Sequence, residues 1–337
     1  MNTRTFAAVS LAFATSLATA ATLPKLNIDP AEISVSGLSS GGYMAVQYHA
    51  VYSASTKGAG IIAAGPYHCA GDGDSIAAIV QNVTNCTRGT PDAAASVAKL
   101  KANADAGLVD AVDHLGKSRV YLFIGTRDSF VSPPVMESLA NYYKALVPAE
   151  RIKYLHDKEA EHAFLTDNPA HATCTAGGLP AVNNCGYDQA GDILQWIYDG
   201  KLNPRKTTAL AGKIVDFEQK AFGTGQQLGL EDTGYAYIPA ECASGERCKL
   251  HVVFHGCGQS ANTVFDNVYG NNGAGYNRWA DSNRMVILYP QVGVSYTNPP
   301  NPFGCWDWWG YSGPGWDTKQ GKQLGAVRAM VEHLVGK

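Results

Sequence analysis

Charged residues are scarce in this sequence: Asp, Glu, Lys and Arg make up 16% of its 337 residues, against roughly 25% in typical soluble domains. The formal net charge is only −3, and the chain contains no dense run of Lys and Arg. The electrostatic footprint of a protein that binds nucleic acid or an anionic membrane is therefore missing. We expect neither partner, and the abundance of small neutral residues suits an uncharged substrate.

Long apolar runs, repeats and linkers are also missing. After the first twenty residues, no stretch approaches the roughly 20 consecutive apolar residues that span a bilayer. Residues 1–20 combine an early Arg4, a mostly apolar stretch and the small residues Ala18-Thr19-Ala20, which is the pattern of a secretory signal peptide. We therefore expect a signal peptide at 1–20 and a single catalytic domain at 21–337, in a monomeric protein secreted to the extracellular space or the periplasm.

None of the eight cysteines forms the C-x-x-C pair that a zinc site would use. We expect no metal and no cofactor. An even number of cysteines in an exported chain favours disulfides. The sequence leaves the connectivity open, but short spacings suggest three local pairs and leave a fourth: Cys69 with Cys86, Cys174 with Cys185, Cys242 with Cys248, and Cys257 with Cys305.

One motif carries most of the functional information. Gly37-Leu38-Ser39-Ser40-Gly41 follows the strand-like run Ile33-Ser34-Val35-Ser36 and matches the G-x-S-x-G nucleophile elbow, in which a sharp strand-to-helix turn exposes a serine hydroxyl. In an α/β-hydrolase several strands normally precede this elbow, whereas almost nothing precedes it here. Either the match is accidental, or the missing strands lie elsewhere in the chain.

Hydrophobic periodicity shows where strands and helices are expected. Strands that alternate with helices imply a largely parallel sheet, and the first half of the chain has this pattern. The second half begins with two strands that could pair antiparallel. The strands are expected at 60–64, 119–124, 151–155, 214–219, 235–239, 249–254 and 285–289, and the helices at 42–52, 93–106, 134–146, 189–198, 276–283 and 318–335.

The second half also contains a loop that a hydrolase usually places before its nucleophile. Phe254-His255-Gly256-Cys257 follows a strand and resembles the His-Gly loop whose backbone amide helps to build an oxyanion hole. A circular permutation explains its position, although the segment could also be a simple tight turn. We therefore predict a circularly permuted α/β-hydrolase, with a mostly parallel central sheet and helices on both faces.

A serine nucleophile needs a base and a carboxylate, in the chain order Ser, acid, His. Asp128 follows the strand that ends at Ile124, and His162 follows the next strand. We predict that His162 accepts the Ser39 proton at Nε2 while Asp128 holds the Nδ1–H group. Other candidates for the acid and the base remain open: Asp157, His156 and His171.

The same reasoning extends to the oxyanion hole and the substrate site. The backbone amides of Ser40 and Cys257 are the expected oxyanion donors. Three tryptophans, Trp306, Trp308 and Trp309, lie in a loop rich in Gly, Pro and Asn. Each could cap the core, but as a cluster they favour a platform for an uncharged, partly apolar substrate.

Taken together, these motifs resemble those of extracellular poly(3-hydroxybutyrate) depolymerases, and most closely the single-domain, circularly permuted type. The resemblance spans nearly the whole chain after residue 20. It is carried by the segments Ser39-Ser40-Gly41-Gly42-Tyr43-Met44, Gly125-Thr126-Arg127-Asp128, His162-Ala163-Phe164, His255-Gly256-Cys257, Tyr289-Pro290-Gln291 and Gly304-Cys305-Trp306-Asp307-Trp308.

The resemblance implies a serine esterase that cleaves polyester polymer or oligomer substrates through an acyl-enzyme. It supports the triad Ser39, Asp128 and His162, and it implies that Trp308 contacts a 3-hydroxybutyrate unit. Unlike larger members of the family, the chain shows no linker and no separate substrate-binding domain. Two other functions stay open: a feruloyl- or acetylxylan-type carbohydrate esterase, and a catalytically inactive binding module.

Overall fold

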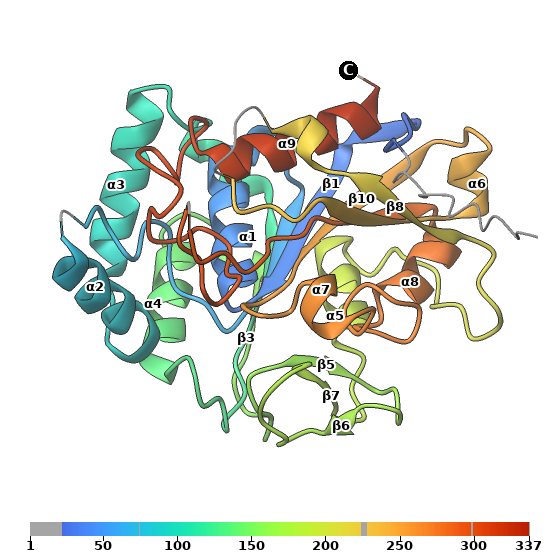
Figure 1. Cartoon of the computed structure of the whole chain (residues 1–337), viewed down its shortest axis with the longest axis horizontal. Helices are drawn as coiled ribbons and strands as arrows, with labels where there is room; N and C mark the ends of the chain where they lie inside the picture. The colour runs from blue at the N-terminus through green and yellow to red at the C-terminus, as the bar shows by residue number, and fades with distance from the viewer. Residues whose placement is uncertain (1–21, 74, 224–227, 298, 337) are drawn as a thin grey trace, which may run out of the picture.

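The computed structural model describes residues 22–73, 75–223, 228–297 and 299–336 (Figure 1). The signal peptide expected at 1–20 lies outside these residues. The beginning and the end of the described chain are neighbours, because the Leu26 N–H donates to the Leu334 carbonyl at 2.9 Å. The side chain of His333 also hydrogen-bonds the Leu23 carbonyl at 2.7 Å.

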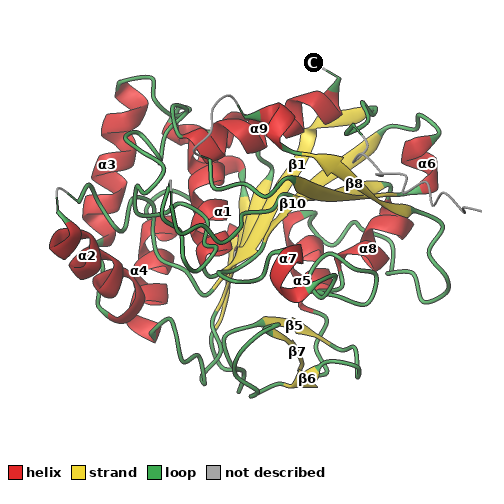
Figure 2. Ribbon diagram, in the orientation of Figure 1, coloured by secondary structure: helices red, strands yellow, loops and turns green. Residues whose placement is uncertain are grey.

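A twisted eight-stranded sheet forms the centre of the molecule (Figure 2). Its strand order is β4-β3-β2-β1-β10-β11-β9-β8, and the pairs from β4 to β11 are parallel, whereas β9 is antiparallel to both of its neighbours. The strands are β1 (Ile28–Leu38), β2 (Gly58–Ile62), β3 (Arg119–Phe123), β4 (Ile152–Leu155), β8 (Lys213–Glu218), β9 (Thr233–Ile238), β10 (Cys248–Phe254) and β11 (Met285–Tyr289).

Helices cover both faces of this sheet, and a small second sheet lies beyond its end (Figure 1). On one face lie α1 (Ser40–Val51), α3 (Ala93–Asp105), α4 (Pro133–Lys144) and α9 (Lys322–Val335), and on the other α5 (Gln189–Ile197) and α8 (Tyr276–Asn283). The remaining elements are α2 (Ile76–Arg88), α6 (Ala240–Ala243), α7 (Ala261–Val264) and the strands β5 (Phe164–Thr166), β6 (Ala172–Thr173) and β7 (Val182–Asn184).

A buried polar chain fixes the pairing of the two central strands. Ser34 and Ser36 on β1 pair in register with His251 and Val253 on β10. His251 Nδ1 lies 2.7 Å from the Ser34 hydroxyl, and its Nε2 lies 2.8 Å from the Ser36 hydroxyl, which also contacts Tyr276. A one-residue slip would leave these groups without partners inside the core, so the network specifies the register.

The prediction of an α/β fold with a mostly parallel sheet and helices on both faces is confirmed. The four expected disulfides, including Cys257–Cys305, are also present. Some expectations differ. The strand expected at 60–64 is Gly58–Ile62, and the small sheet of β5, β6 and β7 was not predicted. The last helix begins at Lys322 rather than Thr318, because residues 315–321 form turns. Helix α2 was not anticipated; it contributes only Cys86 to the interior and leaves Ile76 and Val80 exposed.

Three histidines are buried inside this fold. Burial lowers the pKa of His49 and His251 to about 3 and that of His255 to about 4. The unfolded chain, with histidine pKa values near 6.5, binds more protons than the folded chain between pH ~4 and ~6.5. The free energy of unfolding therefore rises with pH in this window, by about 1.4 kcal/mol per pH unit for each histidine.

We therefore expect acidification from about pH 7 to about pH 5 to destabilise the protein. Urea unfolding at several pH values measures this dependence. His251→Gln should flatten it by roughly one third, whereas the same change at the exposed His156 should leave it unaltered. A stability that stays constant across this pH range would show that the three histidines are not held neutral by the fold.

Candidate active site

The carboxyl ends of the parallel strands meet at one edge of the sheet, where the predicted site residues gather. Ser39 follows β1, and the loops that carry Asp128 and His162 follow β3 and β4. The loop of His255 follows β10, which pairs with β1 on its other side. Segments far apart in the chain therefore share this edge, where α/β folds place their ligands.

Ser39 has the strained backbone of a nucleophile elbow. Its φ and ψ of 58° and −125° lie in a region that residues other than glycine rarely adopt. The turn is held by the Ser39 N–H, which donates to Ile62 at 2.9 Å, and by the Ser39 carbonyl, which accepts from Tyr43 at 2.9 Å. Strain at a residue fixed by its neighbours is typical of functional sites.

Glycines flank this turn because there is no room for a side chain at either position: the start of α1 approaches Gly37, and the end of β10 approaches Gly41. A Cβ at Gly37 would lie 2.2 Å from the Gly41 carbonyl oxygen. A Cβ at Gly41 would lie 2.2 Å from the carbonyl oxygen of Phe254, at the end of β10. The absence of both side chains therefore lets the first turn of α1 touch the neighbouring strand.

Asp128 and His162 form a buried pair. His162 Nδ1 lies 2.8 Å from Asp128 Oδ2, and the two side chains are 9% and 2% exposed. The other carboxylate oxygen accepts the N–H groups of Phe130 and Val131 at 2.9 and 2.7 Å. The carboxylate is thus fixed within its own turn. Because it holds Nδ1, the other ring nitrogen, Nε2, is the one left to accept a proton.

Glu161 braces the two loops that carry this pair, a role that the sequence analysis missed. Its Oε1 accepts the N–H groups of Ser129 and His162 at 2.7 and 2.9 Å. Although burial would raise its pKa, these hydrogen bonds hold the pKa of Glu161 below its ordinary value. The only signal in the sequence is an acidic residue directly before the histidine.

The other candidates for base and acid lie in different surroundings. His156 and Asp157 are exposed at the end of β4, where the His156 ring stacks on Tyr154. His171 is bonded through Nε2 to the Asn272 carbonyl at 2.6 Å. None of these three residues forms a His–carboxylate pair with another, whereas Asp128 holds His162.

His255 anchors the loop beside the nucleophile. A Cβ at Gly256 would lie 3.4 Å from the Ser39 Cβ, so this loop and the elbow are in contact. His255 Nε2 accepts the Val292 N–H at 3.0 Å, which leaves Nδ1 to donate to the Gly256 carbonyl at 2.7 Å. Gln259 adds a third tie, since its side chain accepts the Gly256 N–H at 2.7 Å.

The two predicted oxyanion donors, Ser40 and Cys257, each directly follow one of the two residues that form this contact, Ser39 and Gly256. Ser40 is the first residue of α1, and the N–H groups of a first helical turn have no acceptor within the helix. Cys257 follows Gly256 in the anchored loop and is joined by a disulfide to Cys305. The disulfide ties this loop to residues 305–321, which we call the aromatic loop.

The three tryptophans of the aromatic loop have different surroundings. Trp306 is fully buried and packs against Phe254 and His255. The prediction that Trp306 contacts substrate is therefore wrong, because its ring fills the core beneath the His255 loop. Trp308 is 5% exposed and stacks on Tyr43, with 4.1 Å between ring centroids. Trp309 is half-buried and meets Trp308 edge-on.

Asp307 organises the backbone around Trp308, and the sequence analysis missed this role too. Its Oδ1 accepts the N–H groups of Trp309, Gly310 and Tyr311 at 3.3, 2.7 and 3.1 Å, and its Oδ2 accepts that of Ser312 at 2.9 Å. Desolvation nevertheless raises the pKa of this buried carboxyl. A sequence signal would be an Asp at the start of a Gly-containing turn.

Across the described ranges, no group of three or more His, Cys, Asp or Glu side chains is arranged to hold a metal ion. Nor does any helix in this part of the chain combine the length and apolar character needed to cross a membrane.

Comparison with known proteins gives close relatives, although no family model matches the chain. A poly(3-hydroxybutyrate) depolymerase of Delftia acidovorans is 42% identical over 334 residues, which cover 97% of this chain and 64% of that protein. The chain thus spans less than two thirds of that relative's length. A polyhydroxybutyrate depolymerase of Talaromyces funiculosus is 38% identical over 329 residues, which cover 94% of this chain and 93% of that protein.

Two solved structures share the fold. The crystal structure of PHB depolymerase from Penicillium funiculosum has a TM-score of 0.86 at 38% identity and covers 94% of this chain and 99% of its own. A PHB depolymerase (S39A) complexed with R3HB trimer has a TM-score of 0.85 at 37% identity, with the same coverage.

The close approach at the elbow gives a stability test. Gly41→Ala should destabilise the protein by at least about 3 kcal/mol or prevent folding, because the new methyl group would collide with rigid backbone. Gly325→Ala is the matched control, since a Cβ there meets no atom within 4 Å. Within α9 it should stabilise by about 0.5–1 kcal/mol. Denaturant unfolding compares the two, and equal effects would contradict the packing argument.

Proposed function

This chain belongs to the poly(3-hydroxybutyrate) depolymerases, and we propose that it hydrolyses ester bonds of poly(3-hydroxybutyrate) or its oligomers through an acyl-enzyme. One observation carries the proposal: a strained serine lies at the same sheet edge as an imidazole whose Nδ1 is held by a buried carboxylate. This combination is what activates a serine hydroxyl for attack on a carbonyl.

In the proposed mechanism, Ser39 attacks the carbonyl carbon of a 3-hydroxybutyryl ester. His162 takes the hydroxyl proton at Nε2, and Asp128 stabilises the resulting imidazolium through the Nδ1–H group. The negative oxygen of the tetrahedral intermediate is stabilised by the N–H groups of Ser40 and Cys257. His162 then protonates the departing alcohol, and water, deprotonated by the same imidazole, releases the acyl group from Ser39.

Trp308 is the proposed subsite residue, because its ring is fixed by Tyr43 and, unlike that of Trp306, keeps a small exposed fraction of 5%. Further apolar side chains are exposed on loops around the site. The Phe130 ring packs at an angle against the His162 ring, with 5.1 Å between the ring centroids. Leu179 lies beside Gly258 in the His255 loop, since its Cδ1 is 3.3 Å from the position of a Cβ on that glycine. Exposed apolar groups next to a catalytic site favour contact with an apolar polyester over contact with a sugar polymer.

The sheet order supports the proposed circular permutation. If the chain began at β8 and its present ends were joined, β8, β9, β10 and β11 would precede β1. The nucleophile would then follow a central fifth strand, as in an α/β-hydrolase. Within the described residues, Leu26 before β1 and Leu334 in α9 are neighbours through a hydrogen bond, and adjoining segments of this kind make such a rearrangement tolerable.

We also propose that residues 21–337 act as one exported catalytic domain. One contiguous cluster of buried apolar side chains runs from Leu23 to Leu334, and the four disulfides suit an oxidising compartment. All the proposed catalytic groups come from one chain, which is consistent with a monomer.

Ser39→Ala should abolish turnover while leaving the fold intact. We expect at least a 10⁴-fold loss of rate, because the acyl-enzyme can no longer form. The measurement is the release of 3-hydroxybutyrate products from amorphous poly(3-hydroxybutyrate), with Ser244→Ala at an exposed turn as the control. A Ser39→Ala variant that keeps most of its rate would rule out this nucleophile. Release of ferulate or acetate from xylan, without products from the polyester, would favour the carbohydrate esterase.

Trp308→Ala should weaken the hydrolysis of a 3-hydroxybutyrate trimer more than that of a small activated ester. We expect KM for the trimer to rise about tenfold, because the exposed edge of the ring and its stack with Tyr43 are both lost. Trp308→Phe should recover much of the loss. Steady-state kinetics on both substrates measure the difference, and equal losses on both would contradict a subsite role.

A further inference from the structure

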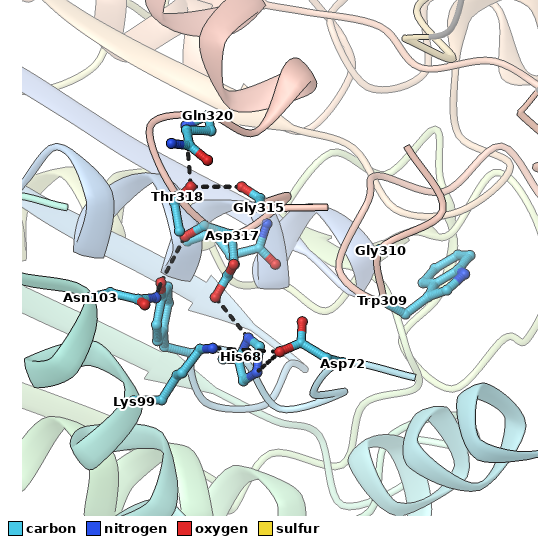
Figure 3. A network of polar contacts seen from close by, with 12 residues as sticks. His68, Asp72, Lys99, Asn103, Trp309, Gly310, Gly315, Asp317, Thr318 and Gln320 are labelled. Carbon is cyan, nitrogen blue, oxygen red and sulfur yellow. Dashed lines mark hydrogen bonds and ion pairs between the residues drawn. The ribbon is translucent and has the colours of Figure 1, made fainter. Parts of the chain in front are cut away.

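A second His–Asp pair lies outside the proposed catalytic triad, where the aromatic loop crosses the segment after β2 (Figure 3). His68 Nδ1 lies 2.7 Å from Asp317 Oδ2, and the side chains are only 12% and 4% exposed. Burial would raise the pKa of Asp317, but the hydrogen bond and the charge of His68 hold it below its ordinary value. The mechanism proposed above makes no use of this pair.

The surroundings of His68 make the pair rigid. His68 has a φ of 55°, in the left-handed region that residues other than glycine occupy infrequently. Its ring is stacked against Trp316, with centroids 5.5 Å apart and planes inclined by 12°. The Tyr67 hydroxyl donates to the Asp317 carbonyl at 2.8 Å and accepts from Asn103 at 2.8 Å.

This pair is connected to the proposed subsite through packed groups. Trp316 lies 3.0 Å from the position of a Cβ on Gly310, whose φ is 89°. Gly310 in turn donates its N–H to Asp307 at 2.7 Å. Asp307 immediately precedes Trp308 in the chain, so the turn that carries Trp308 rests on the ring that covers His68.

The aromatic loop needs such support because it has little regular structure of its own. It runs from the disulfide at Cys305 to the start of α9 at Lys322 without a helix or strand. Ordering the backbone of each residue costs conformational entropy. A loop that was free between its two ends would have to be ordered again on binding, at the expense of affinity.

We propose that His68 and Asp317 are positioning residues, a latch that holds the aromatic loop so that Trp308 presents a preformed subsite to the polyester chain. The latch rests on the proposed function, because it takes Trp308 as the group that meets substrate. It selects for extended substrates: the trimer and the polymer use the subsite, whereas a small activated ester needs only the triad.

His68→Ala is the test variant, with His68→Asn as its matched rescue. The Asn side-chain amide can place a donor close to the position of Nδ1, and Asn tolerates a positive φ. We expect His68→Ala to raise KM for a 3-hydroxybutyrate trimer about tenfold, with kcat/KM for a small activated ester unchanged. For His68→Asn, both values should stay within about threefold of those of the parent chain. Asp317→Asn has the same shape but loses the charge, so its trimer KM should lie between those of His68→Asn and His68→Ala.

Two further measurements complete the design. Asp72 lies on the exposed side of His68, with its Oδ2 3.7 Å from His68 Nε2 and 3.5 Å from Lys99 Nζ. Lys99→Ala, which removes only this outer contact, should leave both substrates unaffected. Acrylamide quenching of tryptophan fluorescence, recorded without substrate, should increase in His68→Ala as the aromatic loop loosens. If His68→Ala does not fold, Asp317→Asn supplies the same readouts.

An unchanged trimer KM together with unchanged quenching would overturn the latch. Equal losses on trimer and small ester would also overturn it, because the pair would then act on the whole site. A parent chain that cleaves small esters but not the trimer would contradict the proposed function instead. In that case quenching alone decides whether His68 holds the loop.

Discussion

The structure depends on the contact between the first turn of α1 and the end of β10. Gly41 permits this contact, since any side chain there would overlap the carbonyl oxygens of Phe254 and His255. Because the two segments touch, the loop that follows β10 lies directly against Ser39. The nucleophile and one proposed oxyanion donor are therefore placed by backbone packing, which a rigid sheet edge maintains more accurately than flexible side chains could.

Around this contact, buried polar side chains satisfy the backbone N–H groups of loops, as helices and strands satisfy their own backbone groups. Glu161, His255 and Asp307 each bind backbone N–H groups of a loop, and Asp317 is bound by a histidine from another segment. A buried N–H or carboxylate without a partner is costly, so each of these loops has one conformation that satisfies its polar groups. The site is thus assembled from irregular segments that are nevertheless fixed.

The sequence was sufficient for features that depend on local pattern. The elbow, the alternation of strands and helices, and three of the four disulfides each involve residues close in the chain, and the fourth disulfide is the pair that remains. The chain order of Asp128 and His162 follows from that alternation. Features set by tertiary contacts could not be read in this way. Trp306 and Trp308 are two residues apart, yet one is buried under His255 and the other stacks on Tyr43. Nothing in the sequence brings His68 to Asp317.

The arrangement separates the chemical step from substrate selection. The proposed triad lies on loops after β1, β3 and β4, whereas the aromatic loop follows β11 and is joined to the other side of the site by Cys257–Cys305. Substitutions in the aromatic loop can therefore alter which ester is bound while the His162–Asp128 pair keeps its geometry. Two segments touch both regions: the His255 loop, through its disulfide, and helix α1, whose Tyr43 stacks on Trp308 and whose Gln47 donates to the Asp307 carbonyl. The three hydrogen bonds and the disulfide of the His255 loop make that loop rigid, so a substitution in the aromatic loop would reach Ser39 mainly through the Tyr43 contact.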